Sequence, residues 1–115
     1  MAADLYLYPV DRIRDYVGES VITKHGAAAF DAAVRAEQMT QAGACRVPAD
    51  DDETPEAQQI REVLAEALCR RVAVNLARRG LPLGMQMSDV GPARLTTNDP
   101  EVRRLEGPYR KLVVG

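Results

Sequence analysis

The sequence is poor in the side chains from which metal sites are built. Its 115 residues include one His, two Cys and no Trp. Cys45 and Cys69 are not spaced as a metal-binding pair, and a single imidazole cannot complete a zinc site. We therefore expect no metal centre. We expect both cysteines to be buried or half-buried free thiols of a protein made in a reducing compartment.

Long apolar runs are also missing. No stretch approaches the roughly 20 residues that a membrane-spanning helix needs. The N-terminus lacks the basic region followed by an apolar region that is typical of a secretory signal peptide. These absences predict a soluble chain that is made in the cytoplasm and has no membrane partner.

Motifs that carry chemistry are absent as well. The sequence has no glycine-rich phosphate loop, no nucleophile elbow and no HExxH pair. His25 stands between Lys24 and Gly26 in an expected connector, where a surface or capping role is favoured over that of a general base. Carboxylates are plentiful, but their spacing identifies no acid/base pair. We expect a protein that is not an enzyme and that binds no cofactor.

The apolar share leans on Ala, with a single Phe, so the predicted core is modest and association could complete it. Charge is unevenly placed, although the formal total is only −2. Residues 1–53 hold ten acids and five bases (net −5), and residues 54–115 hold seven acids and ten bases (net +3). This split suits head-to-tail contact between copies. The slightly acidic total argues only weakly for nucleic acid.

One long helix dominates the prediction. Thr54 is a good N-cap, and Pro55 suits the first helical position. No Gly or Pro interrupts the chain from there to Arg79, where Gly80 and Pro82 provide the stop. At about 1.5 Å per residue, this helix over residues 55–79 is on the order of 37 Å long.

The apolar residues of this helix fall on two sides rather than one. One side holds Val63, Ala67 and Val74, and the other holds Ala65, Leu68, Cys69, Val72 and Leu76. Arg71 and Asn75 fill the gap between them, and Glu66 and Arg70 are ordered for an i,i+4 ion pair. Two interpretations stay open. Either one side meets the C-terminal arm or a second subunit, or the helix has one broad core face with a snorkelling Arg71.

Shorter elements precede the long helix. A helix is predicted over Val10–Val17, ended by Gly18, and a second over Ala27–Gln41, ended by Gly43. The segment Glu19–Gly26 is predicted to be a connector. Residues 1–8 and 44–48 are expected to be extended. The acidic run Asp50, Asp51, Asp52 and Glu53 lacks the ligand spacing of a calcium loop, so it is interpreted as a solvated loop that favours the following helix N-terminus.

Composition changes after Gly80. Residues 85–89 and 93–97 are predicted to form a β-hairpin, and Asp99-Pro100 begins a helix over residues 101–106. Residues 109–115 are β-prone and have no evident partner strand. The expected fold is mainly α: a small helical bundle around the helix 55–79, with a short β-hairpin and an extended C-terminal arm. We expect a helical-bundle domain over residues 1–84 and an appendage over residues 85–115.

Two stretches resemble a known family. Residues 67–84 (ALCRRVAVNLARRGLPLG) and residues 99–111 (DPEVRRLEGPYRK) are similar to the head-to-tail adaptors, or head-completion connectors, of long-tailed phages, particularly those that infect actinobacteria. The order of the predicted parts is similar too. Members of that family are small helical bundles that assemble as a ring, usually dodecameric, beneath the portal.

The resemblance implies a structural virion protein of the neck, between capsid and tail. Its implied partners are other copies in a ring of probably 12, the portal protein and a downstream connector or stopper protein, with double-stranded DNA passing through the lumen without sequence-specific binding. The implied portal-binding strand is Tyr109, Arg110, Lys111, Leu112, Val113 and Val114, although this strand could instead pair with the chain's own hairpin. A separate hypothesis places Asp50, Asp51, Asp52 and Glu53 of one copy against Arg71, Arg78 or Arg79 of its neighbour, and Asn75 is a further candidate interface residue.

The main alternative is a DNA-binding helical module, such as a helix-turn-helix regulator or a packaging accessory protein. In that interpretation the arginine-rich long helix would read DNA. Apolar residues on several of its sides make such a helix awkward in a groove. Arg70, Arg71, Arg78 and Arg79 also spread around the helix rather than forming one stripe along a phosphate backbone.

Overall fold

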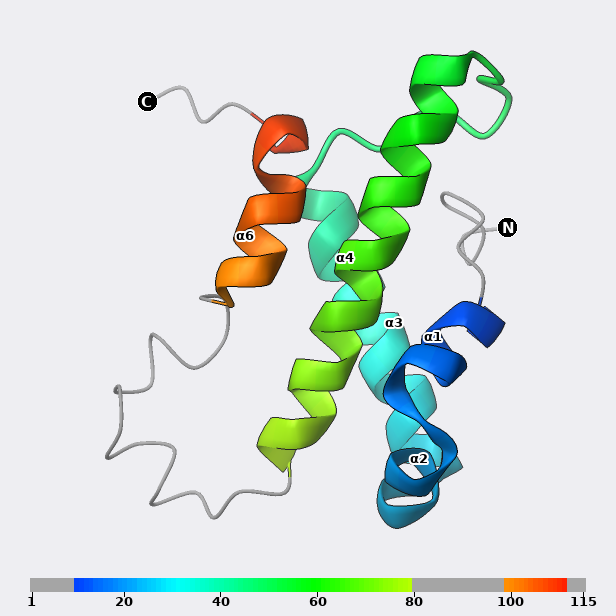
Figure 1. Ribbon diagram of the computed structural model, residues 1–115, viewed down its shortest axis with the longest axis vertical. Coiled ribbons are helices and arrows are strands. Elements are labelled where there is room, and N and C mark those ends of the chain that lie inside the picture. Colours follow the sequence, from blue (N-terminus) through cyan, green and yellow to red (C-terminus); the bar gives the residue numbers. More distant parts are fainter. Residues whose placement is uncertain (1–9, 80–98, 112–115) are drawn as a thin grey trace.

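A computed structural model describes residues 10–79 and 99–111, and these residues are mainly helical, as predicted (Figure 1). The elements are α1 (Val10–Val17), α2 (Glu19–His25), α3 (Ala27–Ala44), α4 (Pro55–Arg79), α6 (Pro100–Glu106) and the 3-10 helix η3 (Gly107–Tyr109). Within the described ranges the only β pairing is an isolated antiparallel bridge between Cys45 and Arg110. The predicted hairpin, the extended residues 1–8 and the expected domain division at residue 84 lie outside the described residues.

The long helix has its predicted bounds. The Thr54 hydroxyl accepts a hydrogen bond from the Ala57 amide at 3.2 Å, which satisfies one of the unpaired donors of the first turn. Asp52 in turn accepts from both the amide and the hydroxyl of Thr54, at 3.1 and 2.8 Å. The acidic loop therefore helps to order the start of α4, as its position before the helix indicated.

The predicted connector between the first two helices is wrong, because residues 19–25 form the helix α2. Gly18 and Gly26 flank it with φ angles of 94° and 96°, which glycine alone adopts without strain. Ile22 is buried between these two turns and packs into the core, so tertiary packing stabilises a short helix that contains β-branched residues. The predicted helix over 27–41 is confirmed, but it continues through Gly43 to Ala44.

The core lies where α1, α2 and α3 pack on one side of α4, as Figure 1 shows. Its buried members are Ile13, Ile22, Phe30, Ala33, Val34, Leu68, Cys69, Val72 and Leu76. On its other side α4 packs against α6. The long helix is thus held from two directions, and the second side is covered by the chain's own C-terminal helix.

Ion pairs fasten the outer helices to α4, but not in the predicted i,i+4 arrangement. The predicted pair between Glu66 and Arg70 is wrong. Glu66 instead accepts from Arg12 of α1 at 2.8 Å, and Arg70 lies 3.0 Å from Asp99 at the start of α6. Both residues therefore form tertiary contacts rather than a local pair along the helix.

Candidate functional site

The most developed polar site joins α4 to α6 through Arg71 and Glu106. Nε of Arg71 donates to one Glu106 carboxylate oxygen at 2.6 Å, and Nη2 donates to the other at 2.7 Å. The Glu106 side chain is fully buried, and that of Arg71 is 7% exposed. The two groups form a buried two-point ion pair, the geometry for which a guanidinium is best suited.

Neighbouring side chains satisfy the remaining polar atoms of this pair. Nε2 of Gln41 donates to Glu106 at 2.8 Å and to the Leu64 carbonyl at 2.9 Å. On the other side of Arg71, Glu37 of α3 accepts from Nη1 of Arg71 at 3.4 Å and from Nδ2 of Asn75 at 2.9 Å. Three helices therefore share one polar network.

The electrostatics keep both partners charged. Burial alone would raise the pKa of Glu106, but hydrogen bonds from Arg71 and Gln41 and the charges of Arg71 and Arg110 hold it below its ordinary value. Burial opposes the charge of Arg71, yet the contacts with Glu106 and Glu37 raise its pKa. Cys45 lies beside Glu106, and burial together with that carboxylate raises the pKa of its thiol to about 11. The thiol is accordingly neutral.

Hydrogen bonds and an ion pair also hold the chain before and after Glu106, at the start of α6 and just after η3. At the start of α6, Asp99 accepts from the amides of Glu101 and Val102 at 2.9 and 3.1 Å, and it also pairs with Arg70. At the other end, the Arg46 amide donates to the Tyr109 carbonyl at 2.8 Å.

A second backbone hydrogen bond holds the chain after η3: the Lys111 amide donates to the Ala44 carbonyl at 2.9 Å. We name residues 99–111 the C-terminal segment. We name the part of the chain that receives it the acceptor surface, which consists of Gln41, Ala44, Cys45, Arg46, Arg70 and Arg71.

These contacts correct the predicted unpartnered arm at residues 109–111, whereas its binding to a portal stays a prediction. Tyr109 belongs to η3, and residues 109–111 are bonded to residues 44–46 of the same molecule through the Cys45–Arg110 bridge and two backbone hydrogen bonds. This part of the arm therefore has a partner within the chain. Leu112, Val113 and Val114 lie outside the described residues.

The acidic part of the predicted subunit interface lies in the loop before α4. Asp50, Asp51 and Glu53 are exposed, whereas Asp52 is half-buried and bonded to Thr54. Nη2 of Arg61 donates to the carbonyl oxygens of Ala49 and Asp52, each at 2.6 Å, and so holds both sides of the turn. The capping contacts at the start of α4 involve Asp52, whereas Asp50, Asp51 and Glu53 are exposed.

The basic part of that interface is only partly at the surface. Arg71 is removed from the candidates, because it is buried and its charge is matched by Glu106 inside the chain. Asn75 is also turned inward, to Glu37. Arg79 is exposed and donates to Asn75 at 2.7 Å, and Arg78 is half-buried. Of the predicted basic set, Arg79 is therefore the exposed member.

Sequence reasoning missed Glu37, Gln41 and Glu106. Arg71 was expected between two apolar sides as a snorkelling or subunit-contact residue, so its burial against a carboxylate was not predicted. Nothing in the pattern selects its partner among the 17 acids of the chain, because the pairing is made by packing between distant helices.

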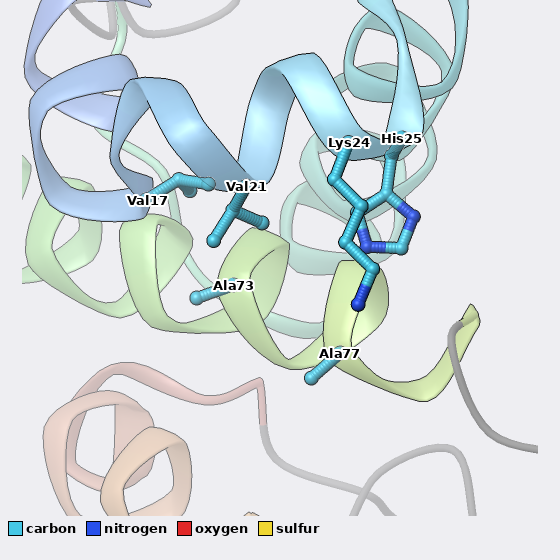
Figure 2. A pocket seen from close by; sticks show the side chains of 6 residues that line it. All are labelled: Val17, Val21, Lys24, His25, Ala73 and Ala77. Atoms are coloured by element: carbon cyan, nitrogen blue, oxygen red, sulfur yellow. The ribbon is translucent and has the colours of Figure 1, made fainter.

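A pocket of about 220 Å³ opens between α2 and the C-terminal half of α4. Val17 and Val21 point toward Ala73, and Lys24 and His25 lie at the end nearer Ala77 (Figure 2). His25 is therefore in the last turn of a helix rather than in a connector. The lining is apolar apart from Lys24 and His25, and it includes no carboxylate.

In the ranges 10–79 and 99–111, no group of three or more His, Cys, Asp or Glu side chains is placed to hold a metal ion. Both cysteines are free and buried, as predicted. Among the described helices, none has the length and apolar character to cross a membrane. Comparison of the chain with protein-family models, with curated proteins and with solved structures gave no match.

Proposed function

We propose that this protein is a head-to-tail adaptor that forms a ring beneath a phage portal, extends the DNA channel and joins the capsid vertex to the next connector or stopper protein. The observation that carries the proposal is the resemblance of residues 67–84 and 99–111 to such adaptors. The described parts of these stretches bind each other, through Arg70 with Asp99 and Arg71 with Glu106. The residues that carry the resemblance are thus also the residues that hold α4 and α6 together.

Charge placement adds support. The acidic loop with Asp50 and Asp51 lies beside the first turn of α4, whereas Arg78 and Arg79 lie in its last turn. Opposite charges at the two ends of one rod suit a head-to-tail contact between copies. Two features expected from the sequence do not support the proposal. The second apolar side of α4 is covered by α6 of the same chain, and the start of the C-terminal arm is bonded to residues 44–46 of the same chain.

The alternative of a DNA-binding module loses support from the same contacts. Arg70 and Arg71 would be half of the basic cluster on the long helix. Each is paired with a carboxylate of the C-terminal segment, so neither charge is available to a phosphate backbone without breaking an ion pair.

The test is assembly on portal rings. Purified protein is mixed with portal rings and examined by negative-stain imaging and light scattering, with the protein alone as the control. A second ring of about a dozen copies on the portal supports the proposal. Absence of any complex, together with steeply salt-dependent DNA binding by a dimer, would replace it with the DNA-binding alternative.

Truncation locates the portal contact. Deletion of residues 108–115 would also remove bonds to Ala44 and Arg46, so a loss of docking would not distinguish binding from folding. Deletion of residues 112–115 leaves those bonds intact. If the shorter deletion still docks normally, Leu112, Val113 and Val114 are not the portal-binding residues.

A further inference from the structure

We propose that the C-terminal segment is exchangeable: it docks on the acceptor surface of its own chain or on that of a second copy. Adjacent copies in an assembly would then be joined by exchanged segments. This proposal deepens the adaptor function and rests on it for its biological setting. The tests below need no portal, so the two ideas can fail separately.

The C-terminal segment is separate from the core formed by the other helices. The buried cluster around Phe30 and Leu68 draws its members from α1, α2, α3 and α4, and residues 99–111 contribute none to it. The segment buries chiefly Val102 and Glu106. It can therefore leave the acceptor surface as a unit without opening that cluster, as is usual for a local unfolding unit.

The contacts that seat the segment are directional rather than merely apolar. They consist of the two-point pair of Arg71 with Glu106, the bond from Gln41, the pair of Arg70 with Asp99, and the backbone bonds of residues 44 and 46 with residues 111 and 109. A buried Glu106 needs an arginine in this geometry, because an unpaired buried charge is strongly unfavourable. Every copy of the chain presents the same acceptor surface, so a second copy satisfies the segment equally well.

The number of residues between α4 and the segment is compatible with docking within one molecule or between two copies. Arg70 receives Asp99, and it lies nine residues before the end of α4 at Arg79, about 14 Å along the helix. The intervening residues 80–98, when extended, could span on the order of 65 Å. In dilute solution the chain's own surface has the higher effective concentration, but in a ring the neighbour's surface lies within similar reach. An exchange of identical elements between copies follows at small energetic cost.

Charge reversal tests the exchange with two full-length variants. Glu106→Arg places like charges together in its own acceptor surface, and so does Arg71→Glu. Each variant alone should expose Cys45 and raise its rate of alkylation at least about tenfold, while Cys69, which lies in the α1–α4 core, stays protected. Mixing the two should give a 1:1 dimer in which each segment finds an opposite charge, and Cys45 protection should return. Two monomers that keep an exposed Cys45 would overturn the proposal.

A double variant shows whether the two reversed charges fit each other in the site, and a disulfide trap provides a second measurement. The double variant Arg71→Glu/Glu106→Arg should protect Cys45 within one chain. If it does not, the reversed charges do not fit the site, and a disulfide trap that keeps Arg71 and Glu106 tests the exchange instead. The trap uses Cys45 and position 110, which face each other across the antiparallel bridge.

In the trap, an isotope-labelled copy carries Arg110→Cys together with Cys45→Ser, and the unlabelled copy is the natural chain. A disulfide between position 110 and Cys45 can then form only between copies. Exchange predicts that this covalent dimer accumulates in a glutathione redox buffer and is identified by mass spectrometry. The matched control carries Arg103→Cys, an exposed position of α6 that is not a bridge partner of Cys45. Equal yields from positions 110 and 103 would refute the exchange.

Discussion

Arg71 and Glu106, 35 residues apart in the chain, form two hydrogen bonds of 2.6 and 2.7 Å in a site almost closed to solvent. The pair connects the long helix to the C-terminal segment. Since removal of one partner strands the other as an uncompensated buried charge, the pair makes the position of α6 specific even where its net contribution to stability is small.

Arg71→Ala is expected to lower the free energy of unfolding by about 3–5 kcal/mol, because Glu106 is then left buried without its cation. Urea denaturation followed by circular dichroism measures the change. The matched control is Arg104→Ala, which removes an exposed pair with Glu101 and should change stability far less, because solvent screens that pair. Equal effects of the two substitutions would show that the burial of the Arg71 pair does not matter.

Asp99 has two roles that two substitutions separate. Asp99→Ala removes both the N-cap of α6 and the partner of Arg70, and it should cost about 1 kcal/mol or more. Asp99→Asn keeps a good capping side chain and loses only the charge, so it should retain most of the stability. Thermal unfolding of the two variants measures the difference. If asparagine is as damaging as alanine, the ion pair rather than the cap stabilises this end.

Stability should fall in acid because of Glu106. Its pKa is held below the ordinary value in the folded chain, so the stabilisation is complete above the unfolded pKa of about 4.3 and is lost as the pH falls through the folded pKa. Urea midpoints measured from about pH 7 down to about pH 3 should therefore decline. The profile of Glu106→Gln should be flatter than that of the natural chain. Parallel profiles would mean that other carboxylates cause the decline.

The glycines differ in what they require. Gly18 and Gly26 have φ angles of 94° and 96°, so Gly18→Ala and Gly26→Ala should each destabilise the chain by roughly 1–3 kcal/mol. Gly43 lies inside α3, and a Cβ there would meet no atom within 4 Å. Gly43→Ala should instead stabilise the chain by about 0.5–1 kcal/mol. Chemical denaturation of the three variants checks both signs, and a stabilising Gly18→Ala would contradict the backbone argument.

The acidic loop provides a test of the subunit contact. Asp50→Lys with Asp51→Lys should impair ring formation and leave the monomer folded, because both side chains are exposed. Asp52→Lys is the control for folding, since Asp52 supports Thr54 at the start of α4 and its loss should destabilise the monomer. Light scattering reports assembly and circular dichroism reports folding. Normal rings from the double variant would reject this contact.

Local signals account for the parts of the fold that the sequence predicts. Thr54-Pro55 and Asp99-Pro100 mark the starts of α4 and α6, because capping and a fixed proline φ act within one turn. Helix α2 was missed since its two flanking glycines suggested an irregular connector. Its stability comes from burying Ile22, which is a tertiary effect.

The candidate site was only half predictable. Arg71 was recognisable as a charge between two apolar sides of a helix, whereas Glu37, Gln41 and Glu106 come from two other helices. Their convergence depends on how α3 and α6 cross α4, which no local pattern specifies. The same limit explains why the residues assigned to a portal strand begin by pairing with residues 44–46.

Arg61 has a consequence for recognition. By bonding the carbonyl oxygens of Ala49 and Asp52, it fixes the backbone that carries Asp50 and Asp51 before any partner arrives. A ligand that engages these two acids therefore loses little freedom in the loop itself, and more of the contact energy remains as affinity. Arg61→Ala should accordingly weaken such binding while leaving every acidic group in place.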